Sequence, residues 1–292
     1  MALAVESVFR FVGVRYSLTD SRGPGKIAVF VLVLPAVLLF TRYVARVSAL
    51  RFIARYATEW RRTLAGFFLM TGATVLVSVA GYVLLAMLGN VEWSPAAWAD
   101  LRGNLVASVA RALLVALMLV MAEEIVFRSF LLRYLRYDDT FPVTVSAVIV
   151  SSAIFSVSHL IALVGVWDEL GKIQLLVGLF VIGMLLGTVY VATGSVACAM
   201  GVHFGLLGFK VALLKTHLLK LVPGWLTGER GDIRMVPLAW LTFLAMALAI
   251  VYWRRWLQQR LRVETVVCPD DGGEFQLAPA SATPAAAFGI SR

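Results

Sequence analysis

The sequence predicts an all-α, polytopic transmembrane helical bundle, and three observations support this fold class. Hydrophobic residues make up 61% of the 292 residues, charged residues make up only 15%, and the mean hydropathy is +0.88. Soluble domains are about 45–50% apolar and about 25% charged. Several apolar runs also approach the ~20 residues that are needed to cross a bilayer. These values exclude a soluble enzyme, a disordered protein and a porin-like barrel, whose strands alternate with period two.

The apolar runs predict about seven membrane spans, or eight if an amphipathic N-terminal segment at Val5–Leu18 also crosses. The predicted spans are Ile27–Phe40, Leu64–Leu88, Leu105–Ala122, Val143–Val166, Ile173–Ala192, Ser195–Leu214 and Val236–Trp253. Residues 1–263 are therefore expected to form one membrane-embedded domain. From Glu264 the chain is rich in Ala, Pro and Gly and has no apolar periodicity, which predicts a disordered tail over residues 264–292.

Polar and aromatic residues mark the ends of several of these spans. Six arginines between Arg42 and Arg62 precede the second span, and Trp93 and Trp98 follow it as aromatic residues suited to a membrane interface. A pair of glutamates ends the third span, and arginines end the last one. These borders thus combine charged or interfacial aromatic residues with the end of an apolar run.

The charge balance is basic, with 26 Lys and Arg residues against 17 Asp and Glu residues. These residues sit at the ends of apolar runs, where they set topology and contact lipid head groups, so nucleic acid is not an expected partner. The basic segments Arg42–Arg62, Arg128–Arg136 and Arg254–Arg262 are expected on the cytoplasmic side. A composition rich in Arg, Ala and Val indicates a GC-rich bacterium, and hence a multi-pass protein of the cell (inner) membrane.

Charged and titratable residues at membrane depth are costly and usually functional. Glu123 and Glu124, Arg128, His159 and His203 are such residues, and the chain has only three histidines in all. Glu124 and Arg128 are four residues apart and can pair on one helix face, while Glu123 points about 100° away. A carboxylate and two imidazoles on three helices can converge inside a bundle, where the carboxylate can act as a general base on water.

Each motif also has a plainer interpretation. A Glu-Glu-Arg cluster at the end of a span is often an interfacial charge cluster, and a histidine in a membrane helix is often a hydrogen-bond partner for another helix. Gly201 and Gly205, on either side of His203, allow such a close approach of helices.

The ordered set of motifs resembles the CAAX protease and bacteriocin-processing (CPBP, or abortive-infection) family of glutamic-type intramembrane endopeptidases. The residues that carry the resemblance are Glu-Glu-Ile-Val-Phe-Arg at 123–128, Phe155 followed by His159, and His203 in a later span. The resemblance covers about Leu101–Leu214.

The resemblance implies a role for each matching residue. Glu123 matches the catalytic glutamate that activates water, and Glu124 and Arg128 match the pair that supports the site. His159 matches the histidine that positions the water, with Phe155 packed before it, and His203 matches the histidine that stabilises the oxyanion. The third motif of the family often continues to an Asn four residues later, where this chain has Leu207, which cannot donate a hydrogen bond. That departure puts the full oxyanion site in doubt, since the loss of one donor can cost ~10²–10³ in rate.

Other chemistries stay open at this point. Glu123, His159 and His203 could bind zinc, although no His-Glu-x-x-His motif is present. A serine mechanism is not favoured, because the sequence has no Gly-x-Ser-x-Gly motif. The other class is a non-enzymatic protein, either a transporter or a degenerate family member that acts as a scaffold or immunity protein. In such a protein the Glu and His residues would form a proton relay or a substrate site.

We therefore predict an intramembrane endopeptidase that cleaves a membrane-anchored or membrane-delivered peptide with a Glu-activated water and without a cofactor. Its expected partners are membrane lipid and a peptide or protein with a membrane-associated segment. Glu123, His159 and His203 should face one polar cavity. The cluster Gly231-Asp232-Ile233-Arg234 is expected either to cap the last span or to border substrate entry.

Overall fold

The computed structural model describes residues 60–94, 105–137, 140–159, 169–215, 219–224, 226–227, 234 and 236–261. The predicted first span, the N-terminal amphipathic segment and the tail lie outside these residues. The third histidine of the chain, His217, and most of the Gly231–Arg234 cluster lie outside them as well. The described part is an all-α bundle with a single two-stranded sheet, which confirms the predicted fold class.

The helices follow the predicted spans closely. They are α4 (Trp60–Met87), α6 (Leu105–Glu124), the π-helical turn η2 (Ile125–Leu132), α7 (Arg133–Leu135), α8 (Phe141–Ser158), α9 (Glu169–Thr193), α10 (Val196–Lys215), α11 (Pro237–Tyr252) and α12 (Arg254–Leu261). Within the described residues, four helices are long and apolar enough to cross a membrane (α4, α8, α9 and α10), or five if the bent pair α11 and α12 counts as one span. The protein is thus a multi-pass membrane protein, with fewer such helices described than the seven predicted.

Two helices form the centre of the bundle. The buried share of the most apolar window is 61% in α9 and 50% in α10, against 22% in α4. Helix α10 packs against α4, α6 and α9, while α9 packs against α8, α10 and α11. The main hydrophobic core follows from this arrangement, with Leu185, Leu186 and Val189 of α9 fully buried beside Val202 of α10. Helices α9 and α10 thereby provide the rigid support for the residues around them.

Local sequence explains why several elements start and stop where they do. Gly194 joins α9 to α10 with a φ of 66°, a left-handed conformation that costs glycine little, and Thr193 accepts a hydrogen bond from the Ser195 N–H. Pro142 and Pro237 lie in the first turns of α8 and α11, where the missing N–H is tolerated.

Close helix contacts depend on the two glycines beside His203. A Cβ atom at Gly205 would lie 2.7 Å from Cβ of Thr74, and one at Gly201 would collide with the carbonyl oxygen of Phe67. Thr71 also donates a hydrogen bond to the Gly201 carbonyl oxygen at 3.1 Å. As expected for small residues in membrane helices, α4 and α10 approach closely at this point.

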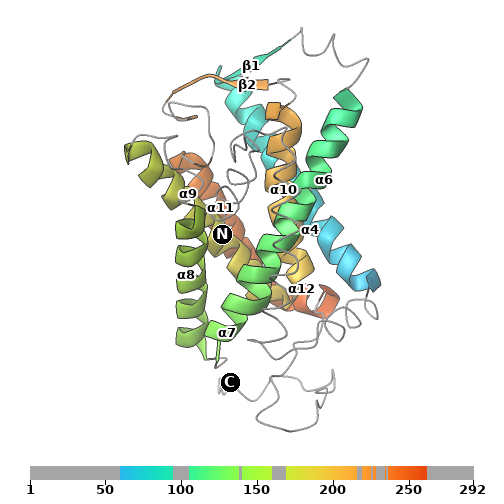
Figure 1. Cartoon of the computed structure of the whole chain (residues 1–292), viewed down its shortest axis with the longest axis vertical. Coiled ribbons are helices and arrows are strands. Elements are labelled where there is room, and N and C mark those ends of the chain that lie inside the picture. The colour runs from blue at the N-terminus through green and yellow to red at the C-terminus, as the bar shows by residue number, and fades with distance from the viewer. Residues whose placement is uncertain are drawn as a thin grey trace, which may run out of the picture.

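Three features differ from the sequence-based prediction. Strand β1 (Val91–Trp93) pairs antiparallel with β2 (Leu219–Leu221), and this sheet was not predicted. Figure 1 places it at one end of the bundle, with α7 and α12 at the other. Helix α8 ends at Ser158, inside the predicted span Val143–Val166, and the side chains of Ser158 and His159 both hydrogen-bond to the carbonyl oxygen of Phe155 there. Residues 160–166 lie outside the described residues. The third difference is the π-helical turn η2, which directly follows Glu124.

Candidate active site

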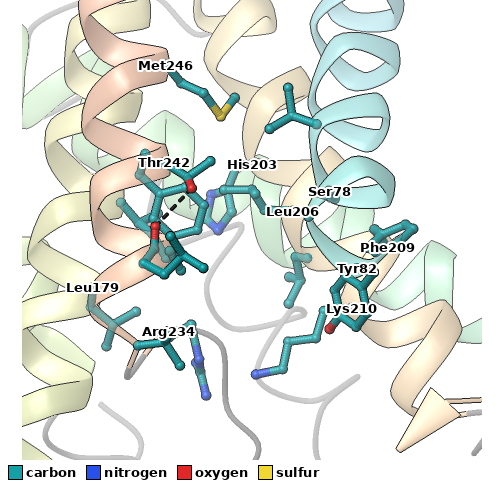
Figure 2. Close-up of a pocket in the computed structure, with 18 of the residues that line it drawn as sticks. Ser78, Tyr82, Leu179, His203, Leu206, Phe209, Lys210, Arg234, Thr242 and Met246 are labelled. Carbon is teal, nitrogen blue, oxygen red and sulfur yellow. Dashed lines mark hydrogen bonds between the residues drawn. The ribbon is translucent and has the colours of Figure 1, made fainter. Parts of the chain in front are cut away.

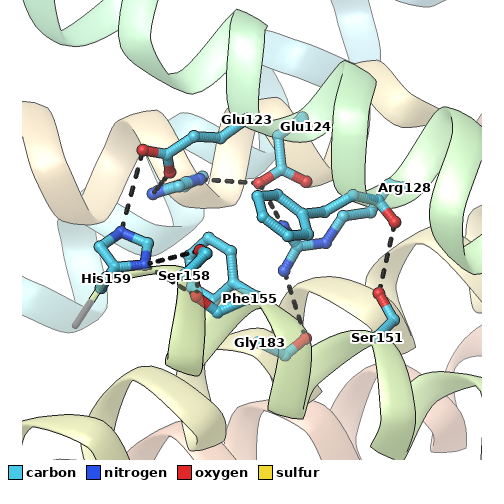
Figure 3. A network of polar contacts seen from close by, with 10 residues as sticks. Glu123, Glu124, Arg128, Ser151, Phe155, Ser158, His159 and Gly183 are labelled. Carbon is cyan, nitrogen blue, oxygen red and sulfur yellow. Dashed lines mark hydrogen bonds and ion pairs between the residues drawn. The ribbon is translucent and has the colours of Figure 1, made fainter. Parts of the chain in front are cut away.

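The first layer of the site is a fully buried ion pair. The side chains of Glu124 and Arg128 are 0% and 1% exposed, and Nη1 of Arg128 donates to Oε1 of Glu124 at 3.0 Å. Nη2 of Arg128 donates to the carbonyl oxygen of Gly183 at 3.4 Å, which ties the pair to α9 (Figure 3). The pairing expected from the four-residue spacing is therefore present, although Arg128 lies in the π-helical turn.

Aromatic rings enclose this buried pair. The guanidinium carbon of Arg128 lies 4.8 Å from the ring centroid of Phe155 and 5.9 Å from that of Phe127. The two rings pack edge-to-face at 5.1 Å. Contact between a cation and aromatic faces is favourable and becomes stronger when the cation is desolvated. Phe155 therefore stabilises the charge of Arg128 as well as filling space before His159.

Glu123 has very different surroundings. Its side chain is 28% exposed, with one carboxylate oxygen 3.9 Å from Nε2 of His159 and the other 3.6 Å from Nε2 of His203. Both distances exceed that of a direct hydrogen bond. The carboxylate consequently faces both imidazoles without forming a direct hydrogen bond to either of them. Its lone pairs are therefore accessible to a small molecule such as water.

The hydrogen bonds of the two histidines set which ring nitrogen faces Glu123. Nδ1 of His203 lies 2.7 Å from Oε1 of Glu124, and Nδ1 of His159 lies 2.8 Å from the carbonyl oxygen of Phe155. Because a carboxylate and a carbonyl oxygen only accept hydrogen bonds, each Nδ1 carries a proton and donates. Both Nε2 atoms then face the Glu123 carboxylate, and their orientation is fixed by the donor on the opposite side of the ring.

The three side chains line one cavity of about 310 Å³, which extends between α4, α10 and α11. Glu123, His159, His203 and Phe155 lie along it together with Leu207. The expected convergence is thus observed, but most of the lining is apolar, contrary to the predicted polar cavity. The reason is that the lining comes largely from membrane-spanning helices, and only a minority of its residues have polar side chains (Figure 2).

The structure also identifies site residues that the sequence analysis missed. Ser158 donates to the carbonyl oxygen of Phe155 and lies 3.4 Å from Nδ1 of His159, while Gly183 supplies the acceptor for Arg128. Lys210 and Arg234 line the cavity as well. Only Arg234 had a sequence signal, as part of the polar cluster just before the last span.

The part of the chain that carries this geometry matches a known family. Residues 105–208 match the model of the Rce1-like family, described as type II CAAX prenyl endopeptidase Rce1-like. This finding confirms the resemblance seen in the sequence and supports peptidase activity at the level of the family. The Rce1-like segment covers less than half of the chain, but it contains all six residues described above. These are Glu123, Glu124, Arg128, Phe155, His159 and His203.

Comparisons with curated proteins and with solved structures gave no match. The Rce1-like segment also contains Leu207, whereas Lys210 and Arg234 lie beyond its end. Within the described residues, no group of three or more His, Cys, Asp or Glu side chains is arranged to hold a metal ion.

Proposed function

We propose that this protein is an intramembrane endopeptidase in which Glu123 activates the attacking water. The observation that carries the proposal is the position of the Glu123 carboxylate, which faces the Nε2 atoms of His159 and His203 inside one cavity. The Rce1-like match over the same helices supports the reaction class. We propose that the active site lies within the membrane-spanning helices and that the protein is located in the cell membrane.

In the proposed reaction, Glu123 takes a proton from water while the oxygen of that water attacks the peptide carbonyl carbon. His159, with its proton fixed on Nδ1, accepts a hydrogen bond at Nε2 and orients the water. When it is protonated on both nitrogens, His203 donates from Nε2 to the developing oxyanion while Nδ1 donates to Glu124. Glu123 then returns its proton to the leaving amine, so that no covalent enzyme intermediate forms.

The substrate proposed for this site is a peptide or protein with a membrane-associated segment, because the cavity is lined mainly by apolar side chains. Peptides related to bacteriocins, or proteins with a C-terminal membrane sorting tail, fit this description. A lipid-modified substrate is not required by the proposal.

A peptidase assay on the purified protein tests this function. Wild-type protein should cleave a membrane-anchored peptide library, and Glu123→Ala should abolish cleavage while the variant still accumulates in the membrane. A scaffold or transporter would show no cleavage that depends on Glu123.

The same assay separates the proposal from zinc chemistry. If Glu123 activates water without a metal, a chelator leaves turnover unchanged. Turnover that is lost in chelator and restored by zinc, with about one metal ion bound per chain, would contradict the proposal.

A further inference from the structure

The two ends of the helical bundle carry different kinds of positive charge. At the end with the β-sheet, the described cations are lysines and Arg234, and Lys220 lies 3.9 Å from Glu92. At the opposite end, where Figure 1 shows α7 and α12, the described cations of α4, α7 and α12 are all arginines. Arginine can bind a phosphate group through two hydrogen bonds at once. The opposite end is thus rich in the cation that is best suited to phosphate.

Four of these arginines are exposed and form what we call the arginine surface. It consists of one residue at the start of α4 and three residues of α12, namely Arg61, Arg254, Arg255 and Arg260. Within the described part of the chain, α4, α7, α11 and α12 contain no Asp or Glu, and none of the four arginines takes part in an ion pair. Their charges therefore face outward without being neutralised by a described residue.

The direction and packing of α12 hold the arginine surface at the border of the membrane. Helices α11 and α12 are bent by 67° relative to each other. A helix that turns this far from the spanning helix before it runs along the membrane surface rather than through the bilayer. Leu257 of α12 is 6% exposed and belongs to the main hydrophobic core, and α12 packs against both α9 and α4. The arginines of α12 are therefore held against the bundle, beside the helix that carries Arg61.

Exposed tryptophans mark the depth of these arginines in the membrane. Trp60, Trp253 and Trp256 are 53%, 57% and 51% exposed, and each is next to an arginine in the sequence. The guanidinium carbon of Arg61 lies 5.5 Å from the ring centroid of Trp60. Tryptophan is enriched where the acyl chains meet the head groups. The neighbouring guanidinium groups therefore lie at the depth of the lipid phosphates.

An anionic phospholipid fits all of these features. Its phosphate accepts charge-assisted hydrogen bonds from arginine, and its acyl chains match the exposed apolar side chains of α4 and α11, such as Leu64 and Leu248. Each cation near an anionic membrane surface strengthens association roughly fivefold. A zwitterionic phospholipid also has a phosphate, but its own ammonium group competes with the guanidinium groups. The net charge of the lipid should therefore decide the preference.

We propose that the arginine surface is a docking site for the head groups of anionic phospholipids, such as phosphatidylglycerol, in the leaflet at this end of the bundle. The bound lipid links α12 to the start of α4 and so stabilises the packing of the last span against the bundle. This inference does not depend on the proposed function, because the cavity that holds Glu123 is lined by none of the four arginines.

Native mass spectrometry of the full-length protein tests the docking site. The protein is released from detergent micelles that contain equal amounts of phosphatidylglycerol and phosphatidylcholine, and the lipids that stay bound are counted. We expect the wild type to retain phosphatidylglycerol roughly tenfold or more over phosphatidylcholine. The double variant Arg254→Gln with Arg255→Gln should lower this preference at least ~fivefold, because the loss of one cation alone is expected to cost about that much. Arg254→Lys with Arg255→Lys keeps both charges and should keep the preference.

Lys172→Gln with Lys220→Gln is the matched control, because it removes two positive charges from the opposite end of the bundle. It should leave the lipid preference unchanged. Melting temperatures of the same samples give a second readout. Phosphatidylglycerol should raise the melting temperature of the wild type and of this control, but not that of the double Arg→Gln variant.

Three results would overturn the docking site. The first is equal retention of the two lipids by the wild type, and the second is an equal loss of preference in the Arg→Gln and Lys→Gln double variants. The third is displacement of the bound lipid by an equal concentration of glycerol phosphate, because the arginines would then recognise a soluble phosphate ester and not a lipid in the membrane.

Discussion

Glu123 and Glu124 are neighbours in the chain, yet their surroundings are opposite. Glu124 is fully buried and bonded to Arg128 and His203, while Glu123 is partly exposed in a cavity and lies beyond hydrogen-bond distance of both histidines. The helix geometry produces this difference, because adjacent residues point about 100° apart. One carboxylate is therefore bound within the buried ion pair, whereas the other faces the cavity with its oxygens partly exposed.

The buried half of this comparison should be the more sensitive one for stability. Glu124→Gln or Arg128→Met leaves a buried charge without its partner, which costs ~3–5 kcal/mol. We expect a large fall in the melting temperature of the purified protein and reduced accumulation in the membrane.

The exposed pair Lys220 and Glu92 on the β-sheet is the control for this prediction. These residues are 3.9 Å apart and both exposed, so breaking the pair with Lys220→Met should cost ~1 kcal/mol or less. Similar melting temperatures for Arg128→Met and Lys220→Met would show that the buried pair does not support the site.

The two histidines differ in the same way, because His203 lies beside both glutamates and His159 lies beside only Glu123. His203→Gln should lower kcat by ~10²–10³, as for the loss of an oxyanion donor, and should also lower the melting temperature. His159→Gln should lower kcat with little change in melting temperature, because its ring is partly exposed. Steady-state kinetics and thermal unfolding of both variants check this prediction, which fails if His159→Gln destabilises the protein as much as His203→Gln does.

A smaller effect is expected at Leu207, which lines the cavity where the CPBP pattern often has an Asn. Leu207→Asn adds a hydrogen-bond donor near the proposed oxyanion, and we expect kcat to rise by about tenfold, a fraction of what a well-placed donor contributes. Leu207→Ala controls for the loss of side-chain volume. If Asn and Ala at this position have the same kcat, the donor at residue 207 plays no part in this protein.

The sequence predicted those features that depend on local periodicity and on charge in an apolar context. The borders of α4, α6, α9, α10 and α11 fall close to the ends of the apolar runs, and the pairing of Glu124 with Arg128 follows from their spacing. The convergence of Glu123 with two histidines could be expected because titratable residues at membrane depth avoid lipid.

Other features depend on contacts that one chain segment does not reveal. The pairing of β1 with β2 joins segments more than a hundred residues apart, and the contacts of Ser158 and His159 with the Phe155 carbonyl oxygen depend on how the end of α8 is built. Lys210 resembles an ordinary residue near the end of a span until α11 brings Arg234 to the same cavity. Tertiary packing, not local pattern, decides these cases.

The role of Glu123 as the base is tested most directly by comparing Glu123→Gln with Glu124→Gln in single-turnover cleavage of one membrane-anchored peptide, with melting temperatures measured on the same samples. The amide at residue 123 keeps the shape of the side chain but cannot accept a proton from water. We expect Glu123→Gln to abolish cleavage and to melt like the wild type, and Glu124→Gln to melt at a clearly lower temperature. Wild-type turnover by Glu123→Gln would show instead that Glu123 is not the base.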